Sequence, residues 1–297
     1  MPSPAFVATL VVDPAQSKLS DAFLARAAQV LPGFAGSRWL DPGVALDLYF
    51  DGDARASQSL AQLAQKHRAD VIVQPAAQRA KRLLVADMDS TLIGQECIDE
   101  LADAAGVGAK VAEITDRAMR GEIPFESALR ERVAMLADLP AETIDHVLAT
   151  RITLTPGART LVQTMRARGA YAAIVSGGFE PFTGTVAHWL GAHEHRANRL
   201  GIAGNRLTGE LVGPILGAEA KREALHEIAA RMGIAPHETI AVGDGANDLA
   251  MLVEAGLGVA YRAKPKVAAA AHARIEYGDL TALLYAQGIP RTEFVEG

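Results

Sequence analysis

A run of carboxylates and hydroxyls follows a short apolar segment in the first third of the chain. The segment 83–86 is typical of a buried strand, and Asp87-Met88-Asp89-Ser90-Thr91 comes directly after it. An aspartate at the carboxyl end of a buried strand can attack phosphorus. A second carboxylate two residues later lies on the same side of an extended chain. The run therefore indicates the start of a phosphate-transfer site; the alternative is a strand that ends in an Asx turn.

Three more groups of residues follow in a fixed order along the chain. They are Val175-Ser176-Gly177-Gly178-Phe179, then Lys221, then Val242-Gly243-Asp244-Gly245-Ala246-Asn247-Asp248. With the Asp87 run, they make four motifs whose order is not expected by chance. From about Leu83 to the C-terminus the chain thus resembles the haloacid dehalogenase-like hydrolases, with Asp87, Ser176, Lys221 and Asp244 as the four anchors.

Strand and helix patterns alternate through this part of the chain. The expected strands are 83–88, 171–176, 239–243 and 258–261, and the expected helices are 158–168, 180–190, 219–232 and 247–254. Such alternation predicts an α/β fold, a Rossmann-like parallel sheet with helices on both faces. Ligands of these sheets lie at the carboxyl ends of the strands. Because Asp87, Ser176 and Asp244 each fall at a strand end, we expect them to converge.

Two insertions interrupt the alternation. Over about 94–152 the strand signal disappears, and amphipathic helices are expected at 98–105, 111–120, 125–137 and 141–150. A helical cap placed directly after the nucleophile can close over the site and exclude water. The second insertion, 194–213, is typical of a β-hairpin with its turn at 201–205.

The first eighty residues have a pattern of their own. Strands are expected at 6–12, 37–40, 44–50 and 71–73, and helices at 19–31 and 54–67. This βαββαβ order predicts a ferredoxin-like α+β domain over residues 1–78, followed by the catalytic domain 79–297 with a linker at 74–82. The small domain resembles the ligand-binding domains called ACT. A dimerisation or docking module without a ligand is the alternative.

The resemblance to the hydrolase family implies a role for each motif. Asp87 would be the nucleophile that forms an aspartyl-phosphate, and Asp89 the acid for the leaving group and later the base that activates water. Lys221 would lie against the phosphoryl group, while Ser176 and the Gly177 amide donate hydrogen bonds to it. Taken alone, such a lysine is more often a solvated helix residue.

The last motif implies a metal site. Asp244, with Asp87 and the main-chain carbonyl of Asp89, would form an oxygen-rich pocket that suits Mg²⁺. We expect Asp248 to orient the lysine or the metal ligands, and Asn247 to hydrogen-bond the phosphate or its ligands. The alternative is a strand-to-helix turn followed by a capped helix.

The cap carries a closer resemblance. Glu96, Met119, Phe125 and Arg132, with the word Arg117-Ala118-Met119-Arg120-Gly121, match the substrate-recognition positions of the phosphoserine phosphatases. The match implies that Glu96 pairs with an ammonium group and Arg132 with a carboxylate, beside an apolar wall of Met119 and Phe125. The implied reaction is hydrolysis of L-phosphoserine to serine and phosphate, the last step of serine synthesis.

Other interpretations remain open at this level. The four cap residues would otherwise be solvated helix charges and ordinary cap core. If the chain is an enzyme, the alternatives are a different small phosphomonoester as substrate, or transfer of the phosphate to homoserine. If it is not an enzyme, the alternative is a regulatory protein whose N-terminal domain senses an amino acid and whose catalytic part is silent.

The composition of the chain limits the classes of partner that it can bind. The chain has 297 residues, 49% of them hydrophobic, and a net charge of −6, without a run of Lys and Arg. We expect a small phosphomonoester as the partner, no nucleic acid and no membrane, and a cytoplasmic location. The N-terminal domain is a candidate surface for a homodimer. The single cysteine, Cys97, excludes an internal disulfide and fits the buried face of a helix.

Overall fold

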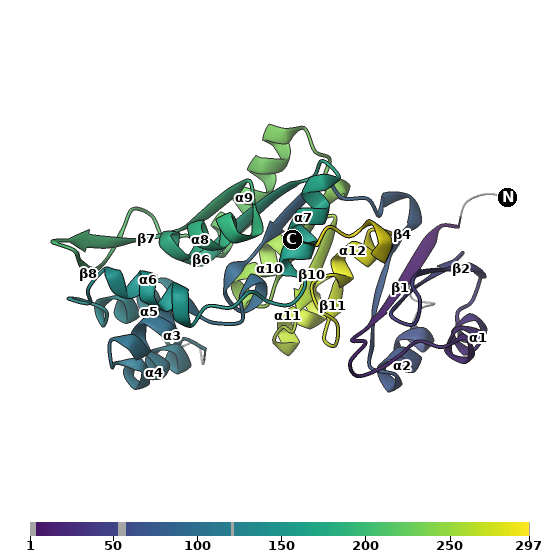
Figure 1. Ribbon diagram of the computed structural model, residues 1–297, viewed down its shortest axis with the longest axis horizontal. Helices are drawn as coiled ribbons and strands as arrows, with labels where there is room; N and C mark the ends of the chain where they lie inside the picture. The colour runs from purple at the N-terminus through teal and green to yellow at the C-terminus, as the bar shows by residue number, and fades with distance from the viewer. Residues whose placement is uncertain (1–3, 53–57, 120–121, 297) are drawn as a thin grey trace.

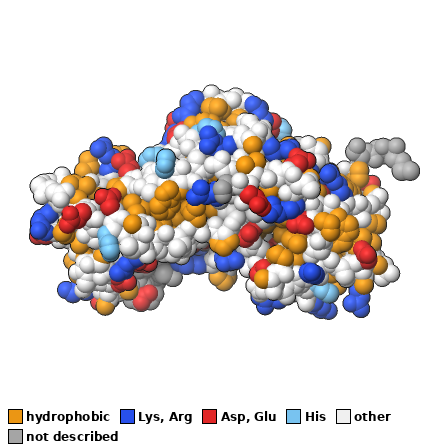
Figure 2. Space-filling view, in the orientation of Figure 1, with side chains coloured by type: hydrophobic (Ala, Val, Ile, Leu, Met, Phe, Trp, Pro, Cys, Tyr) orange, Lys and Arg blue, Asp and Glu red, His pale blue; other side chains and the backbone are white. Residues whose placement is uncertain are grey.

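The computed structural model describes residues 4–52, 58–119 and 122–296, without the side chain of Met119. The molecule is elongated, with a small sheet at one end, a larger sheet in the middle and a group of helices at the other end (Figure 1). Lys and Arg side chains are interspersed with Asp and Glu over the face shown in Figure 2. Among the described residues, no helix has the length and apolar character needed to cross a bilayer.

The N-terminal unit has the predicted βαββαβ order. Its elements are β1 (Phe6–Val12), α1 (Asp21–Val30), β2 (Phe34–Asp41), β3 (Ala45–Phe50), α2 (Gln58–Lys66) and β4 (Ala69–Pro75). The four strands form an antiparallel sheet in the order β2-β3-β1-β4. Both helices pack on one face of it, where Phe23 and Leu60 are buried against Leu10 and Leu48. The first residues of the predicted helix 54–67 lie outside the described part of the chain.

The other face of this sheet packs against the catalytic unit. Asp47 is fully buried on β3 and forms an ion pair with Arg79, 2.7 Å from nitrogen to oxygen. Arg79 also donates hydrogen bonds to the carbonyls of Tyr285 and Ala286, near the C-terminus. The segment 74–82, which was expected to be a linker, begins inside β4. It is packed between the two units, and Arg79 makes contacts with both of them.

A second polar contact joins the two units. The carboxylate of Asp70, on β4, accepts hydrogen bonds from the main-chain N–H groups of Glu276, Tyr277 and Gly278. One face of the small sheet is therefore covered by its own helices, and the other contacts the catalytic unit, while four of the eight residues of the edge strand β2 are exposed. A homodimer through the N-terminal domain stays a prediction, and it would have to use a different surface of that domain.

The catalytic unit is built on a seven-stranded sheet, as predicted for the Rossmann-like core. Its strands are β5 (Leu83–Ala86), β6 (Tyr171–Phe179), β7 (Glu194–Ala203), β8 (Arg206–Val212), β9 (Thr239–Gly243), β10 (Leu257–Tyr261) and β11 (Ala273–Ile275). Their order is β11-β10-β9-β5-β6-β7-β8, and the β7–β8 pair is antiparallel whereas the other neighbours run parallel. The strand β5 that leads to Asp87 thus lies between β9 and β6, in the middle of the sheet.

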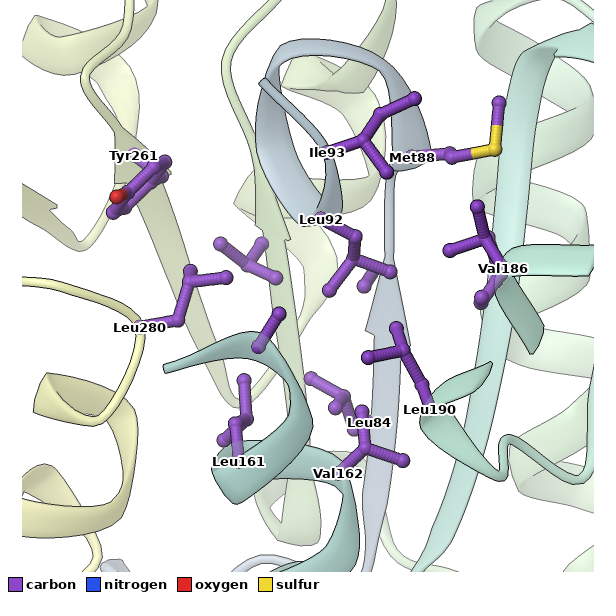
Figure 3. Packing of buried hydrophobic residues seen from close by; sticks show 14 of the residues in the cluster. Leu84, Met88, Leu92, Ile93, Leu161, Val162, Val186, Leu190, Tyr261 and Leu280 are labelled. Carbon is purple, nitrogen blue, oxygen red and sulfur yellow. The ribbon is translucent and has the colours of Figure 1, made fainter. Parts of the chain in front are cut away.

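Helices cover both faces of this sheet. They are α7 (Ala158–Ala167), α8 (Glu180–Leu190), α9 (Ala218–Met232), α10 (Leu249–Glu254), α11 (Pro265–Ala270) and α12 (Ala282–Ala286), with short turns η2 (Ala76–Gln78), η3 (Met88–Leu92), η4 (Pro236–Glu238), η5 (Ala246–Asp248) and η6 (Arg291–Glu293). Side chains alternate along β5. Leu84 packs with Leu161, Val162 and Leu190 of α7 and α8 (Figure 3), whereas its neighbour Val85 packs in a separate cluster with α9 and α10.

The insertion after β5 forms the predicted helical cap. Its helices are α3 (Cys97–Ala104), α4 (Gly108–Met119), α5 (Phe125–Ala134) and α6 (Glu142–Thr150). The predicted end of the second helix, Arg120, and the next residue, Gly121, lie outside the described residues. Helix α5 ends three residues earlier than predicted. The reason is tertiary, because Asp138 takes a left-handed backbone conformation, φ 65°, and donates its N–H to the Leu207 carbonyl of β8 instead of continuing a helix.

The β7–β8 hairpin, also predicted, packs against the cap. Its turn is Gly204-Asn205, both with positive φ, which matches the twist of a two-residue hairpin. Leu207 exchanges main-chain hydrogen bonds with the α5–α6 connection, and Ala141 donates to the Asn205 carbonyl. The hairpin therefore connects the cap to the central sheet (Figure 1).

Candidate active site

The ends of three neighbouring strands gather the predicted motifs at one edge of the sheet. Asp87 follows β5, Ser176 lies near the end of β6, and Asp244 follows β9. The Asp87 N–H donates to the Val242 carbonyl at 3.0 Å, which extends the β5–β9 pairing up to the site. The predicted convergence of the three motifs is thus observed, because the carboxyl ends of parallel strands meet at a single edge.

A tight turn fixes the orientation of Asp87. Its Oδ1 accepts the Met88 N–H at 2.7 Å, and the Ile93 N–H closes the turn on the Met88 carbonyl at 3.0 Å. Ser90 has a φ of 53°, which reverses the chain so that the residues of the motif surround one point. Only 4% of Asp87 is exposed, so the protein interior limits where its other carboxylate oxygen can point.

That oxygen meets the buried lysine. Lys221 Nζ lies 2.7 Å from Asp87 Oδ2 and 2.7 Å from Asp248 Oδ1, and none of the lysine is exposed. Burial alone would lower the pKa of Lys221, but the two carboxylates outweigh it and raise that pKa above its usual value. The lysine is therefore buried between two carboxylates and is not a solvated helix residue.

Both carboxylate oxygens of Asp248 accept hydrogen bonds. Its Oδ1 accepts from Lys221, and its Oδ2 accepts the Gly245 N–H at 2.9 Å. Burial and the charge of Asp87 raise the pKa of Asp248, and the lysine opposes this. Asp248 is therefore hydrogen-bonded to Lys221 on one side and to the Gly245 amide on the other. A β-carbon on Gly243 would lie 2.3 Å from the Asp248 carboxyl carbon, so only glycine fits there.

Asp244 completes a cluster that can hold a metal ion. One oxygen from each of Asp87, Asp244 and Asp248 lies within 4.8 Å of the others. Burial and the Asp87 charge raise the pKa of Asp244 to about 6, which indicates negative charge that the protein leaves uncompensated. Thr91 donates to Asp244 Oδ1 at 3.3 Å. Oxygens of Asp87 and Asp244 thus fit a hard divalent cation. The role of Thr91 was missed, although it belongs to the first motif.

Asp89 has different contacts from the nucleophile two residues before it. Its Oδ1 accepts the Cys97 N–H at 3.3 Å, and a β-carbon on Gly178 would come 2.6 Å from its Oδ2. Burial, with the charges of Glu96 and Asp87, raises the pKa of Asp89 well above its usual value. The two aspartates of the first motif therefore have different environments. Gly178, which makes room for Asp89, was not predicted to have a role.

The second motif approaches the cap. Ser176 is buried, and its Oγ accepts the Gly178 N–H at 2.9 Å. A β-carbon built on Gly177 would lie 3.6 Å from the Phe125 ring and 3.8 Å from Asn247 Nδ2. Gly177, Asn247 and Phe125 thus border the same space, although they come from β6, from the turn after β9 and from the cap.

Two charged residues of the cap, Glu96 and Arg132, were predicted to recognise the substrate. Ser90 donates to Glu96 Oε1 at 2.6 Å, and burial with the charges of Asp244 and Asp87 raises the pKa of Glu96. Arg132 is half-buried on α5; burial lowers its pKa, and the nearby charges of Asp99 and Glu96 oppose this. Glu96 thus lies beside the first motif and Phe125 beside Gly177, whereas Arg132 donates hydrogen bonds to the Ala128 carbonyl and to Thr115 within the cap. The side chain of Met119, the fourth predicted cap residue, lies outside the described part.

The comparison with known proteins identifies the family. The model of the family described as haloacid dehalogenase-like hydrolase matches residues 84–253, more than half of the chain. The chain belongs to the haloacid dehalogenase-like hydrolases. A phosphoserine phosphatase of Archaeoglobus fulgidus is 43% identical over 239 residues, which cover 80% of this chain and 69% of that protein. A phosphoserine phosphatase of Streptomyces coelicolor is 47% identical over 215 residues, or 72% of this chain; the match spans 52% of its length.

Solved structures of this hydrolase family agree with the fold. A haloacid dehalogenase family hydrolase of Salmonella enterica serovar Typhi superposes with a TM-score of 0.85 at 30% identity, over 95% of this chain and 98% of that one. A phosphoserine phosphatase solved as a phospho-aspartyl intermediate analogue gives a TM-score of 0.65 at 43% identity, over 69% of this chain and 98% of that one. The predicted fold class and the predicted family are confirmed.

Proposed function

We propose that this hydrolase is a phosphoserine phosphatase that cleaves L-phosphoserine to serine and inorganic phosphate. The observation that carries the proposal is the phosphoryl site, in which Lys221 pairs with Asp87 at 2.7 Å, together with Glu96, which is held by Ser90 of the first motif. We assign Arg132, on the cap helix α5, to the carboxylate of the substrate. Phosphoserine has one phosphate, one ammonium and one carboxylate, and each would meet an opposite charge. The similarity to curated phosphoserine phosphatases supports this assignment.

The chemistry proceeds in two steps. An oxygen of Asp87 attacks phosphorus as the bond from phosphorus to the serine oxygen breaks, and Asp89 gives its proton to that oxygen. Asp89 then takes a proton from water, which attacks the aspartyl-phosphate, releases inorganic phosphate and restores Asp87. Lys221, the Ser176 hydroxyl and the Gly177 amide stabilise the charge on the phosphoryl oxygens. The raised pKa of Asp89 is consistent with an acid in the first step.

Asp87 and Asp244, with the Asp89 carbonyl as the expected third ligand, would hold Mg²⁺. When bound, the ion supplies positive charge at the phosphoryl group, so that a carboxylate can approach it. Asp248 keeps the lysine in place, as its two hydrogen bonds indicate. Asn247, whose amide lies beside Gly177, would hydrogen-bond the phosphate.

The cap would select the serine part. Glu96, oriented by Ser90, would bind the ammonium group, and Arg132 would bind the carboxylate. Phe125 reaches Gly177 from the cap and, with Met119, would form the apolar wall that displaces water. We also propose the division into domains 1–78 and 79–297, with the cap at about 94–152; the two separate sheets support it.

The proposal is tested by measuring phosphate release from L-phosphoserine with Mg²⁺, beside Asp87→Asn and a panel of other phosphomonoesters. Release from phosphoserine in preference to the panel, abolished in the variant and by chelation, is the expected result. Better turnover of an ester without an amino group would contradict the assignment of the cap. Growth of a serine auxotroph that lacks its own phosphatase, restored by this gene, would test the proposed place in cytoplasmic serine synthesis.

A further inference from the structure

Asn198 is a buried polar residue that the function proposed above does not use. It lies on β7, where the hairpin leaves the central sheet, and only 2% of it is exposed. Its Nδ2 donates to the Gly177 carbonyl at 2.8 Å, and its Oδ1 accepts the Leu216 N–H at 2.8 Å. One side chain therefore connects two segments that are distant in sequence, the end of β6 and the loop before α9. Both segments border Gly177 and the start of the helix that carries Lys221.

The end of β6 needs such a connection. The β6–β7 pairing has a register irregularity between Val175 and Phe179, so the regular ladder is interrupted around Gly177. A main-chain carbonyl that leaves a ladder needs another donor when it is buried. Asn198 supplies this donor, and on the next residue the Gly178 N–H is held by Ser176 Oγ. The peptide group between Gly177 and Gly178 is thus fixed at both ends, which fixes the adjoining Gly177 amide.

The second segment is the loop before α9, the helix that carries Lys221. Leu216 directly precedes Gly217, the N-cap of α9, and the Gly217 carbonyl accepts the Lys221 N–H at 3.2 Å. The hydrogen bond from Leu216 to Asn198 therefore anchors the start of α9. An asparagine side chain has both the donor and the acceptor that these two contacts require, whereas an aspartate can only accept.

We propose that Asn198 is a positioning residue for phosphoryl binding. It holds the Gly177 amide and the first turn of α9 in the arrangement that receives the phosphate, without touching the substrate itself. The inference rests on the proposed function, because it assumes that the phosphoryl group lies between Gly177 and Lys221. It predicts that damage at Asn198 weakens phosphate binding and leaves the cap's contacts with serine intact.

Asn198→Asp is the sharpest test. The variant keeps the acceptor for Leu216, but it places a carboxylate oxygen against the Gly177 carbonyl. We expect kcat/KM for L-phosphoserine to fall about 10-fold to 100-fold. The inhibition constant for inorganic phosphate should rise about 10-fold, while the affinity for L-serine stays within about twofold. Asn205→Asp, in the exposed hairpin turn, introduces the same charge change on the same hairpin and should leave all three quantities unchanged.

Three results would overturn the inference. One is an unchanged phosphate inhibition constant in Asn198→Asp; another is an equal loss of phosphate and serine affinity, as expected of a purely structural residue. If this variant does not fold by circular dichroism, Asn198→Ala, which removes both contacts without adding a charge, replaces it. Unchanged phosphate inhibition in Asn198→Ala is the third. The phosphate measurement uses whichever ester the wild type cleaves best, so it stays readable if phosphoserine is not the substrate.

Discussion

The buried pair of Lys221 and Asp248 allows a quantitative prediction for Asp248→Asn. Asp248 is fully buried, and its two oxygens serve two donors, Lys221 Nζ at 2.7 Å and the Gly245 N–H at 2.9 Å. Asparagine is nearly the same size but has one oxygen and an NH₂ group. Whichever way the amide turns, one of the two donors faces another donor. Gly243 packs against this carboxyl group, so the side chain has little room to move away.

The magnitude follows from what remains around the lysine. Breaking a buried ion pair by removing one partner destabilises a protein by about 3–5 kcal/mol. Because Lys221 keeps Asp87 as a second partner at 2.7 Å, we take the lower end, about 3 kcal/mol. This is a large part of the roughly 5–15 kcal/mol that stabilises an ordinary protein. We therefore expect Asp248→Asn to fold, with a clearly lower free energy of unfolding.

Urea unfolding in the presence of a chelator measures this free energy by linear extrapolation, without a contribution from metal binding. Asp116→Asn, an identical chemical change at an exposed position on α4, should shift it by less than about 0.5 kcal/mol. If Asp248→Asn lowered the free energy of unfolding by less than about 1 kcal/mol, with the slope of that free energy against urea concentration unchanged, the reasoning would be refuted. It would mean that the charge of Asp248 is not needed to keep Lys221 buried.

Three further predictions concern Glu96, Lys81 and Arg79. Glu96→Gln should lower kcat/KM for L-phosphoserine by roughly 10-fold to 100-fold and leave that for glycerol phosphate unchanged; equal losses for both esters would contradict the ammonium assignment. Burial lowers the pKa of Lys81 from 10.5 to about 8, so between these values the unfolded chain holds a proton that the folded chain has lost. Stability should therefore rise with pH across this window, by up to about 3 kcal/mol relative to Lys81→Met in parallel urea titrations, and a constant difference would count against it. Arg79→Met should destabilise the chain by about 3–5 kcal/mol in urea, because it leaves Asp47 buried and unpaired, and adding Asp47→Asn should restore part of the loss; no recovery would argue against the ion pair.

Much of the site was accessible from sequence because its residues stand at strand ends. A buried strand followed by polar residues recurs three times, and parallel pairing brings the three ends together without further information. The four cap helices and the hairpin were predicted from hydrophobic periodicity and turn residues. Local sequence patterns were therefore sufficient to predict these elements and the strand ends that meet at the site.

The features that were missed depend on contacts between distant segments. Asn198 carries no local signal, since its partners lie 21 and 18 residues away in sequence. Gly178 is a glycine because Asp89 occupies the space of a side chain. Helix α5 ends early because Asp138 bonds to the hairpin, and residues 74–82 appeared to be a linker because the Asp47 partner of Arg79 is not visible in sequence. Tertiary packing overrides local preference at each of these positions.

The central claim is that Asp87 takes the phosphoryl group from L-phosphoserine. It is tested most directly by mixing the wild-type protein with Mg²⁺ and L-phosphoserine labelled in its phosphate, quenching in acid, and mapping the label by mass spectrometry. We predict one phosphoryl group on the peptide that contains Asp87, and none in Asp87→Asn. Label on another residue, or continued phosphate release by Asp87→Asn, would contradict the account.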